Sequence, residues 1–211
     1  CNCCGGYQII GSSPERLVSV KEGQVTTNPI AGTRPRGKDE REDKALAEEL
    51  LADEKEVAEH RMLVDLGRND IGKIAQNNSV EVTKYMEVEY FRYVMHLTSV
   101  VRGQLLPQLT AMDALKSTLP AGTVSGAPKI RAMKRIYELE QEKRGVYAGA
   151  IGYLSATGDM DFAIAIRTMI LKNGRAYVQA GAGIVYDSIP TNEYQETINK
   201  AKSMTKIGEM Q

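Results

Sequence analysis

Two glutamates in one helical stretch have the spacing of a cation site. Glu56 and Glu59 lie three residues apart, and on a helical wheel both fall in an apolar sector with Leu63 and Leu66. Acids in an apolar sector need a partner, because removing a carboxylate from water is costly. A metal ion or a buried cation would supply that partner. The alternative is that Glu56 belongs to a helix-capping box and Glu59 to a structural ion pair.

A second acidic group lies near the end of the chain. Glu193, Glu196 and Lys200 occupy positions i, i+3 and i+7 of a predicted helix and span about 60° of its wheel. By itself this arrangement is typical of a solvated charged face. It would also supply oxygen ligands if it met the first acidic helix, since two carboxylates from different helices commonly hold Mg²⁺.

Residues 29–37, PIAGTRPRG, combine two prolines and two glycines with three side chains that donate hydrogen bonds. Thr33, Arg34 and Arg36 are suited to binding a carboxylate or a phosphate. A solvated connecting loop would have much the same composition, so both interpretations stay open at this point.

Two glycine-rich stretches resemble nucleotide-binding loops but fail on spacing. Residues 120–129, PAGTVSGAPK, lack the Gly-Lys-Ser/Thr sequence of a phosphate loop, and residues 179–185, QAGAGIV, lack the third glycine of a dinucleotide turn. Their backbone amides and Thr123 could still bind another anion, with Arg167 and Tyr147 on neighbouring β-like stretches. A nucleotide-binding module is therefore a weak alternative.

The remaining pattern indicates an α+β fold with largely antiparallel sheets flanked by helices. Strand-like and helical stretches are mixed without the strict alternation that a parallel sheet requires, and one domain is expected. Asp53 is a plausible N-cap of one helix, and Ser125 of another that holds Pro128 in its first turn. The predicted strand regions are 7–30, 79–105 and 147–185, and the predicted helical regions are 38–74, 110–119, 125–144 and 190–210.

The composition excludes several classes of protein. The 211 residues include 27 basic and 27 acidic side chains, a balance that argues against a general nucleic-acid binder. No apolar run is long enough to span a membrane and no signal peptide is visible, so we expect a cytoplasmic protein. Cys1, Cys3 and Cys4 are too close together to staple a fold, so residues 1–6 are predicted to be a non-native or disordered terminus.

Seven stretches together resemble the chorismate-utilising enzymes, most closely the anthranilate synthase component I family. They follow in the family's order over nearly the whole chain after residue 6. The stretches are SSPERL, PIAGTRPRG, DEKEVAEHRMLVDLGRND, LPAGTVSGAPK, RGVYAGAIGYL, FAIAIRT and QAGAGIV followed by EYQETINKA. The resemblance implies the family's chorismate-binding domain over residues 7–211, as the C-terminal portion of a chain truncated on its N-terminal side.

The resemblance also implies a substrate site. In the family, Mg²⁺ holds the ring carboxylate of chorismate through acids that match Glu59 and Glu196, with Glu56 and Glu193 nearby. The residues implied in substrate binding are Thr33, Tyr147, Arg167, Gly181 and Gly183. The residues implied in catalysis are His96, Thr123, Lys200 and Glu15, of which Glu15 matches the general acid that protonates the hydroxyl leaving from C4.

The reaction implied by the resemblance is the addition of ammonia to C2 of chorismate with loss of the C4 hydroxyl. Elimination of pyruvate then gives anthranilate, for tryptophan biosynthesis, and a glutamine amidotransferase subunit supplies the ammonia. The residue that selects the nucleophile and the tryptophan feedback site are expected upstream of this chain. The fragment alone is expected to be inactive or nearly so.

Three alternatives to this reaction remain. An isochorismate or salicylate synthase shares the AGT motif within residues 29–37. An aminodeoxychorismate synthase is disfavoured, because Ala31 stands where those enzymes typically carry a nucleophilic lysine. The non-enzymatic alternative is a fragment that acts only as a ligand-binding module.

Overall fold

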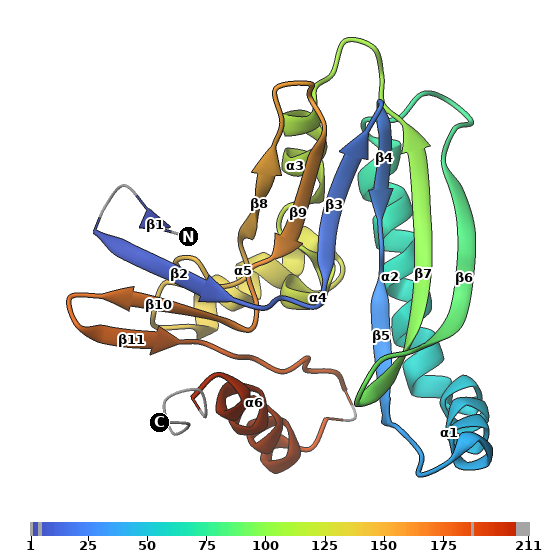
Figure 1. The fold of residues 1–211 in the computed structure, drawn as a ribbon, viewed down its shortest axis with the longest axis vertical. Coiled ribbons are helices and arrows are strands. Elements are labelled where there is room, and N and C mark those ends of the chain that lie inside the picture. Colours follow the sequence, from blue (N-terminus) through green and yellow to red (C-terminus); the bar gives the residue numbers. More distant parts are fainter. Residues whose placement is uncertain (1, 4–5, 187, 206–211) are drawn as a thin grey trace. The chain divides into compact units, whose positions relative to one another are not determined.

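A computed structural model describes residues 2–3, 6–186 and 188–205 of the chain (Figure 1). The chain forms two compact units, each assembled from separate parts of the sequence. Unit 1 comprises Cys1–Pro14, Pro120–Ile151 and Ala163–Gln211, and unit 2 comprises Glu15–Leu119 and Gly152–Phe162. The single domain expected for residues 7–211 stays a prediction.

Unit 2 is built on a sheet whose strands β3 to β7 pair antiparallel. The strands follow the order β5-β7-β4-β3-β9-β8, and β6 also pairs with β7. Their bounds are β3 Arg16–Lys21, β4 Gln24–Thr27, β5 Ile30–Pro35, β6 Glu81–Tyr90, β7 Val94–Gln104, β8 Ala150–Leu154 and β9 Met160–Ile164. The predicted strand regions 7–30 and 79–105 are confirmed.

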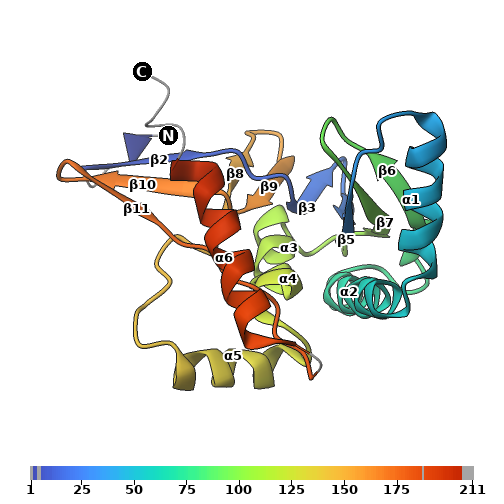
Figure 2. The ribbon, with the colours of Figure 1, turned by 90° about the horizontal axis from the view of Figure 1, so that it is seen from below.

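Three helices pack on this sheet, namely α1 Glu40–Ala52, α2 Glu54–Gly72 and α3 Ala111–Thr118. Helices α1 and α2 contact β5 and β7, and α3 contacts β3. Figure 2 shows α2 end-on against the strands. The predicted helical region 38–74 is therefore two helices, and they divide at Asp53 because its side chain accepts hydrogen bonds from the first amides of α2. The N-cap prediction for Asp53 is confirmed.

The core of unit 2 lies between β7 and the helices. Met95 and Leu97 of β7 are fully buried and pack with Ala47 and Leu50 of α1. Further along β7, a Cβ added to Gly103 would meet Ile71 Cγ2 of α2 at 2.7 Å. The odd-numbered side of β7 is therefore the surface on which both helices pack, because side chains alternate between the faces of a strand.

Unit 1 contains a second antiparallel sheet, with strand order β1-β2-β10-β11. The strands are β1 Asn2–Cys3, β2 Tyr7–Gly11, β10 Thr168–Lys172 and β11 Arg175–Val178, and the helices are α4 Gly122–Ser125, α5 Lys129–Leu139 and α6 Pro190–Thr205. Asn173 and Gly174 form the turn between β10 and β11 with positive φ angles of 51° and 70°. The α+β fold with largely antiparallel sheets is thereby confirmed.

The structure differs from the sequence predictions at the helix over 125–144 and at the terminus over 1–6. The helix predicted over 125–144 is shorter, because Gly126 has a φ of 104° and separates α4 from α5. Ser125 therefore ends α4 and donates a hydrogen bond to the carbonyl of Ala121, and Pro128 is the N-cap of α5. Of the terminus predicted over 1–6, residues 1, 4 and 5 lie outside the described residues, whereas Asn2–Cys3 pairs with β2.

Within the described part of the chain, no helix is both long enough and apolar enough to cross a membrane.

Because Gly103 lies close to α2, replacing it with alanine should destabilise the protein more than the same replacement at Gly72. A Cβ at Gly103 would also meet Ala75 Cβ at 2.9 Å, so Gly103→Ala should lower the free energy of unfolding by about 1–3 kcal/mol. Gly72, at the end of α2, has nothing within 4 Å of an added Cβ, so Gly72→Ala should be neutral or stabilising. Urea unfolding of both variants checks this, and equal effects would contradict the packing described.

Candidate functional site

The residues expected at the site fall into both units. Unit 2 holds Glu15, Thr33, Glu56, Glu59 and His96, and unit 1 holds Thr123, Tyr147, Arg167, Gly181, Gly183, Glu193, Glu196 and Lys200.

The arginines of residues 29–37 bind carboxylates of the chain itself. Arg34 donates through Nε to Glu49 and through Nη2 to Asp53, both at 2.9 Å. Arg36 makes an ion pair with Asp43, whose pKa is lowered mainly by this hydrogen bond and then by that of a backbone amide. Most of this stretch is strand β5 and not the connecting loop considered from the sequence, and two of its three donors, Arg34 and Arg36, bind acids of the chain itself. The third donor is Thr33.

Thr33 and His96 meet on adjacent strands, β5 and β7. His96 Nδ1 lies 3.0 Å from Thr33 Oγ1 and 3.0 Å from the carbonyl oxygen of Gly32. A carbonyl only accepts, so we assign the proton to Nδ1. In neutral His96 the lone pair is then on Nε2. The prediction brought these two residues to one site from distant parts of the sequence, and the structure places them in contact.

Glu56 lies against the backbone of β5. A Cβ added to Gly32, whose φ is 71°, would meet Leu50 Cδ1 at 3.0 Å and Glu56 Oε2 at 3.3 Å. Only glycine leaves this space open at this backbone conformation. The half-buried Glu56 has a raised pKa, first because burial disfavours its charged form and then because Glu59 and Asp53 are also negative.

Glu59 is exposed, so the expectation that both acids lie within the apolar sector holds only for Glu56. The buried face of α2 passes through His60, Leu63 and Ile71. Glu59 lies about 90° from the centre of that face, because each residue advances the helix by about 100°. From the sequence, Leu63 and Leu66 place the apolar sector of this helix. Because Leu66 is only half-buried, that sector lies too far towards Glu59.

Glu15 is half-buried and immediately precedes β3. The pKa shift that a general acid requires remains a prediction for this residue.

The unit 1 residues form a connected group around the loop of residues 179–185. Lys200 Nζ donates to the carbonyl of Gly181 at 3.2 Å and pairs with Glu196 Oε1 at 2.5 Å. Arg167 Nη1 donates to the carbonyl of Lys200 at 3.3 Å. A Cβ added to Gly181 would lie 2.8 Å from the hydroxyl of Tyr147. The structure therefore gathers five of the predicted residues.

Arg144 joins this group and was not recognised in the sequence. Its guanidinium lies 5.6 Å from the centroid of the Tyr147 ring, pairs with Glu140 and donates to the carbonyl of Val124 at 2.6 Å. Burial is the main cause of the raised pKa of Tyr147. The signal was the spacing in RGVY, where an arginine three residues before a tyrosine can stack on its ring.

The other predicted residues of unit 1 are more separate. Thr123 on α4 and Gly183 are exposed, and Glu193 on α6 is half-buried. Among the residues that the structure describes, no group of three or more His, Cys, Asp or Glu side chains is placed to hold a metal ion. Each unit instead presents two glutamates three residues apart on one helix.

His60 is the second histidine of the chain and is completely buried on α2. Its Nε2 lies 2.6 Å from Ser99 Oγ, which accepts a hydrogen bond from the amide of Met86. Nδ1 has no hydrogen-bond partner among the described residues. Burial lowers the pKa of His60 to about 4, so the ring is neutral at pH 7.

His60 predicts a loss of stability in mild acid. Below pH 6.5 the unfolded chain binds a proton that folded His60 does not accept until about pH 4, so stability falls as the pH falls through this window. Between pH 7 and pH 4.5 the free energy of unfolding should fall by about 2–3 kcal/mol from this cause. His60→Gln, which cannot titrate, should reduce the fall by that amount, and His96→Gln should retain it because His60 is still present. Urea unfolding at both pH values measures the difference.

The sequence is similar to several named proteins. It is 66% identical over 203 residues to anthranilate synthase component 1 of Lactococcus lactis. The aligned residues make up 96% of this chain and 44% of that protein. It is 60% identical over 202 residues to anthranilate synthase component 1 of Acetivibrio thermocellus, with 96% and 41% covered. The chain thus spans less than half the length of these relatives.

Two solved structures are similar in fold. Anthranilate synthase component I of Streptococcus pneumoniae matches with a TM-score of 0.89 and 82% identity, covering 96% of this chain and 44% of that one. The menaquinone-specific isochorismate synthase of Escherichia coli matches with a TM-score of 0.85 and 30% identity, covering 95% and 46%. The model of the chorismate binding enzyme family matches residues 3–206, and the resemblance found in the sequence is confirmed. The chain therefore belongs to the family of chorismate-binding enzymes.

Proposed function

We propose that this chain is the chorismate-binding part of an anthranilate synthase component I, a lyase of tryptophan biosynthesis. One observation supports this choice above the alternatives. The chain is 82% identical to a solved anthranilate synthase component I and 30% identical to a solved isochorismate synthase, although both share its fold. An aminodeoxychorismate synthase is again disfavoured by Ala31.

In this proposal the unit 1 group binds the enolpyruvyl carboxylate of chorismate. Arg167 presents a planar guanidinium fork, which suits a carboxylate. The hydroxyl of Tyr147 beside Gly181 donates a second hydrogen bond, and the amides of Gly181 and Gly183 donate others. Lys200 keeps this loop next to α6 through its bond to the Gly181 carbonyl.

The unit 2 group contacts the ring of chorismate. Thr33 Oγ1 and His96 Nε2 are the polar groups that β5 and β7 present, and the Nδ1 hydrogen bonds fix the orientation of the imidazole. Glu15 protonates the hydroxyl that leaves C4, which requires a protonated carboxyl at the start of the reaction. Thr123 on α4 completes the residues around the ring.

The glutamates of α2 and α6 have the type of side chain that binds magnesium ions. Their carboxylate oxygens are the ligands that Mg²⁺ prefers. The pKa of Glu56 is raised first by burial and then by the negative charges of Glu59 and Asp53, and a nearby cation would oppose this shift. Glu59 and Glu196 would hold the ion, with Glu56 and Glu193 beside them. When bound, Mg²⁺ withdraws electrons from the ring carboxylate of chorismate.

The proposal includes the partners of the reaction. Ammonia adds at C2 of the ring, and a glutamine amidotransferase subunit supplies it from glutamine. The expected compartment is the cytoplasm.

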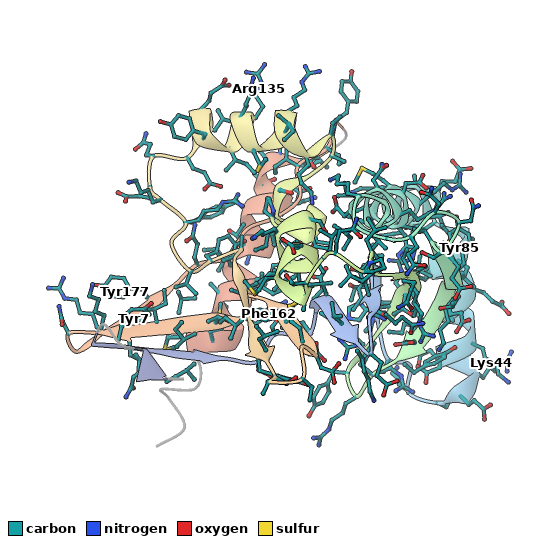
Figure 3. The ribbon with its side chains drawn as sticks, turned by 90° about the horizontal axis from the view of Figure 1, so that it is seen from above. Tyr7, Lys44, Tyr85, Arg135, Phe162 and Tyr177 are labelled. Atoms are coloured by element: carbon teal, nitrogen blue, oxygen red, sulfur yellow. The ribbon has the colours of Figure 1, made fainter. Side chains whose placement is uncertain are left out.

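Incubation of the full-length protein with chorismate, Mg²⁺ and ammonia tests the reaction. Fluorescent anthranilate is the expected product, and isochorismate without incorporated nitrogen would overturn the proposal. The 211-residue chain in the same assay should show almost no turnover, because apolar side chains of α5 are uncovered. Tyr137 is 88% and Leu139 is 79% exposed, and Figure 3 shows Arg135 of the same helix pointing outwards.

Replacing Glu196 with glutamine should change the binding of chorismate but not the stability of the protein. Glu196→Gln should abolish the Mg²⁺ dependence of chorismate binding, because it removes a charged oxygen ligand. The free energy of unfolding should change by less than about 0.5 kcal/mol, since the ion pair with Lys200 is an exposed i,i+4 pair. Glu138→Gln, which removes an exposed glutamate paired with Arg135 on α5, is the matched control. Calorimetric titration of chorismate with and without Mg²⁺ decides, and Mg²⁺-dependent binding by Glu196→Gln would exclude the two-helix site.

A further inference from the structure

Arg34 joins the strand that carries Thr33 to the helix that carries Glu56. Its Nη2 donates to Asp53 Oδ2 at 2.9 Å, and its Nε donates to Glu49 at 2.9 Å. The side chain of Arg34 is 19% exposed and that of Asp53 is 31% exposed. This pair is therefore less hydrated than the surface ion pairs of α1 and α2, and its geometry is more restricted.

The other oxygen of Asp53 holds the first turn of α2. Oδ1 accepts from the amide of Lys55 at 3.1 Å and from the amide of Glu56 at 3.2 Å. Arg34 and α2 thus bind opposite oxygens of one carboxylate. A rotation of that carboxylate to follow one partner would break the bonds to the other.

In β5, Arg34 follows two residues that contact the site, Gly32 and Thr33. Gly32 approaches Glu56 Oε2, and its carbonyl accepts from His96 Nδ1. Thr33 lies between Gly32 and Arg34 and contacts His96 Nδ1. The distance between Glu56 and this stretch of β5 therefore depends on how β5 is held to the start of α2.

We propose that Arg34 and Asp53 are positioning residues, which hold the glutamates of α2 at a fixed place relative to Thr33 and His96. The proposal rests on the proposed function, because it assigns Glu56 and Glu59 to the magnesium site. Neither residue touches the substrate. Their effect is on the affinity for Mg²⁺ through the location of two carboxylates.

Two variants of the full-length protein test the proposal. Arg34→Met removes the guanidinium and keeps an unbranched stem. Asp53→Asn keeps a good N-cap, since asparagine caps as well as aspartate, but weakens the bond to Arg34. Arg16→Met is the matched control, because Arg16 makes two hydrogen bonds of 3.1 Å to Asp161 in the same unit, on strands β3 and β9.

The dissociation constant of Mg²⁺, measured by calorimetry with saturating chorismate, should rise about tenfold in Arg34→Met and in Asp53→Asn. The double variant should match the single ones, because both break the same link. Arg16→Met should stay within twofold of the wild type. Asp53→Asn should lower the urea midpoint only slightly, because asparagine keeps the N-cap. The binding measurement is made without urea, where the variant is folded, so a general loss of stability does not explain its weaker Mg²⁺ binding.

Hydrogen exchange of the Lys55 and Glu56 amides provides a measurement that does not depend on the substrate. Exchange should be about tenfold faster in Arg34→Met and unchanged in Arg16→Met. Unchanged exchange in Arg34→Met would overturn the link, and faster exchange with unchanged Mg²⁺ affinity would overturn its effect on the site. If the wild type shows no Mg²⁺-dependent chorismate binding, the proposed function fails, and the exchange rates still decide whether Arg34 fixes α2.

Discussion

The structure of unit 2 depends on the burial of strand β7. It pairs with β5 over its first half, with β4 over its second half and with β6 along nearly its whole length, and α1 and α2 pack against it. Most polar groups of a strand enclosed in this way need partners, because an unpaired polar group in the interior is costly; among the described residues, Arg102 Nε of β7 is buried without one. Ser99, which is fully buried, meets this requirement by contacting His60 and the amide of Met86.

The same constraint accounts for the location of the candidate site in unit 2. Met95 and Leu97 point towards the helices, so His96 points to the opposite face, beside Thr33. Glu56 lies close to the backbone of Gly32, whose carbonyl accepts from His96, because glycine leaves the space open. The site is thus assembled around a buried strand, and Arg34 of β5 and Arg36 just after it bind acids of α1 and of the N-cap of α2.

Unit 1 achieves a comparable arrangement with backbone carbonyls. Lys200 binds the carbonyl of Gly181, and Arg167 binds the carbonyl of Lys200. These bonds place the segment just before β10, the glycine-rich loop and α6 in one connected group. Arg144, stacked on Tyr147 and bonded to Val124, extends the group to α4. A set of residues spread over some 80 positions is therefore held by a few long-range hydrogen bonds.

The sequence by itself determined most of the strand and helix regions, the α+β class, the cap at Asp53 and the family, but not the break at Asp53 between α1 and α2 or the start of α5 after Pro128. These features depend on local backbone preferences and on motifs whose order along the chain is visible directly. Tertiary structure alone decided which partners the charged groups bind: Arg34 and Arg36 looked like donors for a ligand, yet Glu49, Asp53 and Asp43 bind them. It also decided that Glu59 is exposed, since the centre of the buried face of α2 depends on where β7 lies. The physical reason is that periodicity reports the direction of a side chain on its own element, whereas burial and ion pairing depend on elements far away in the sequence.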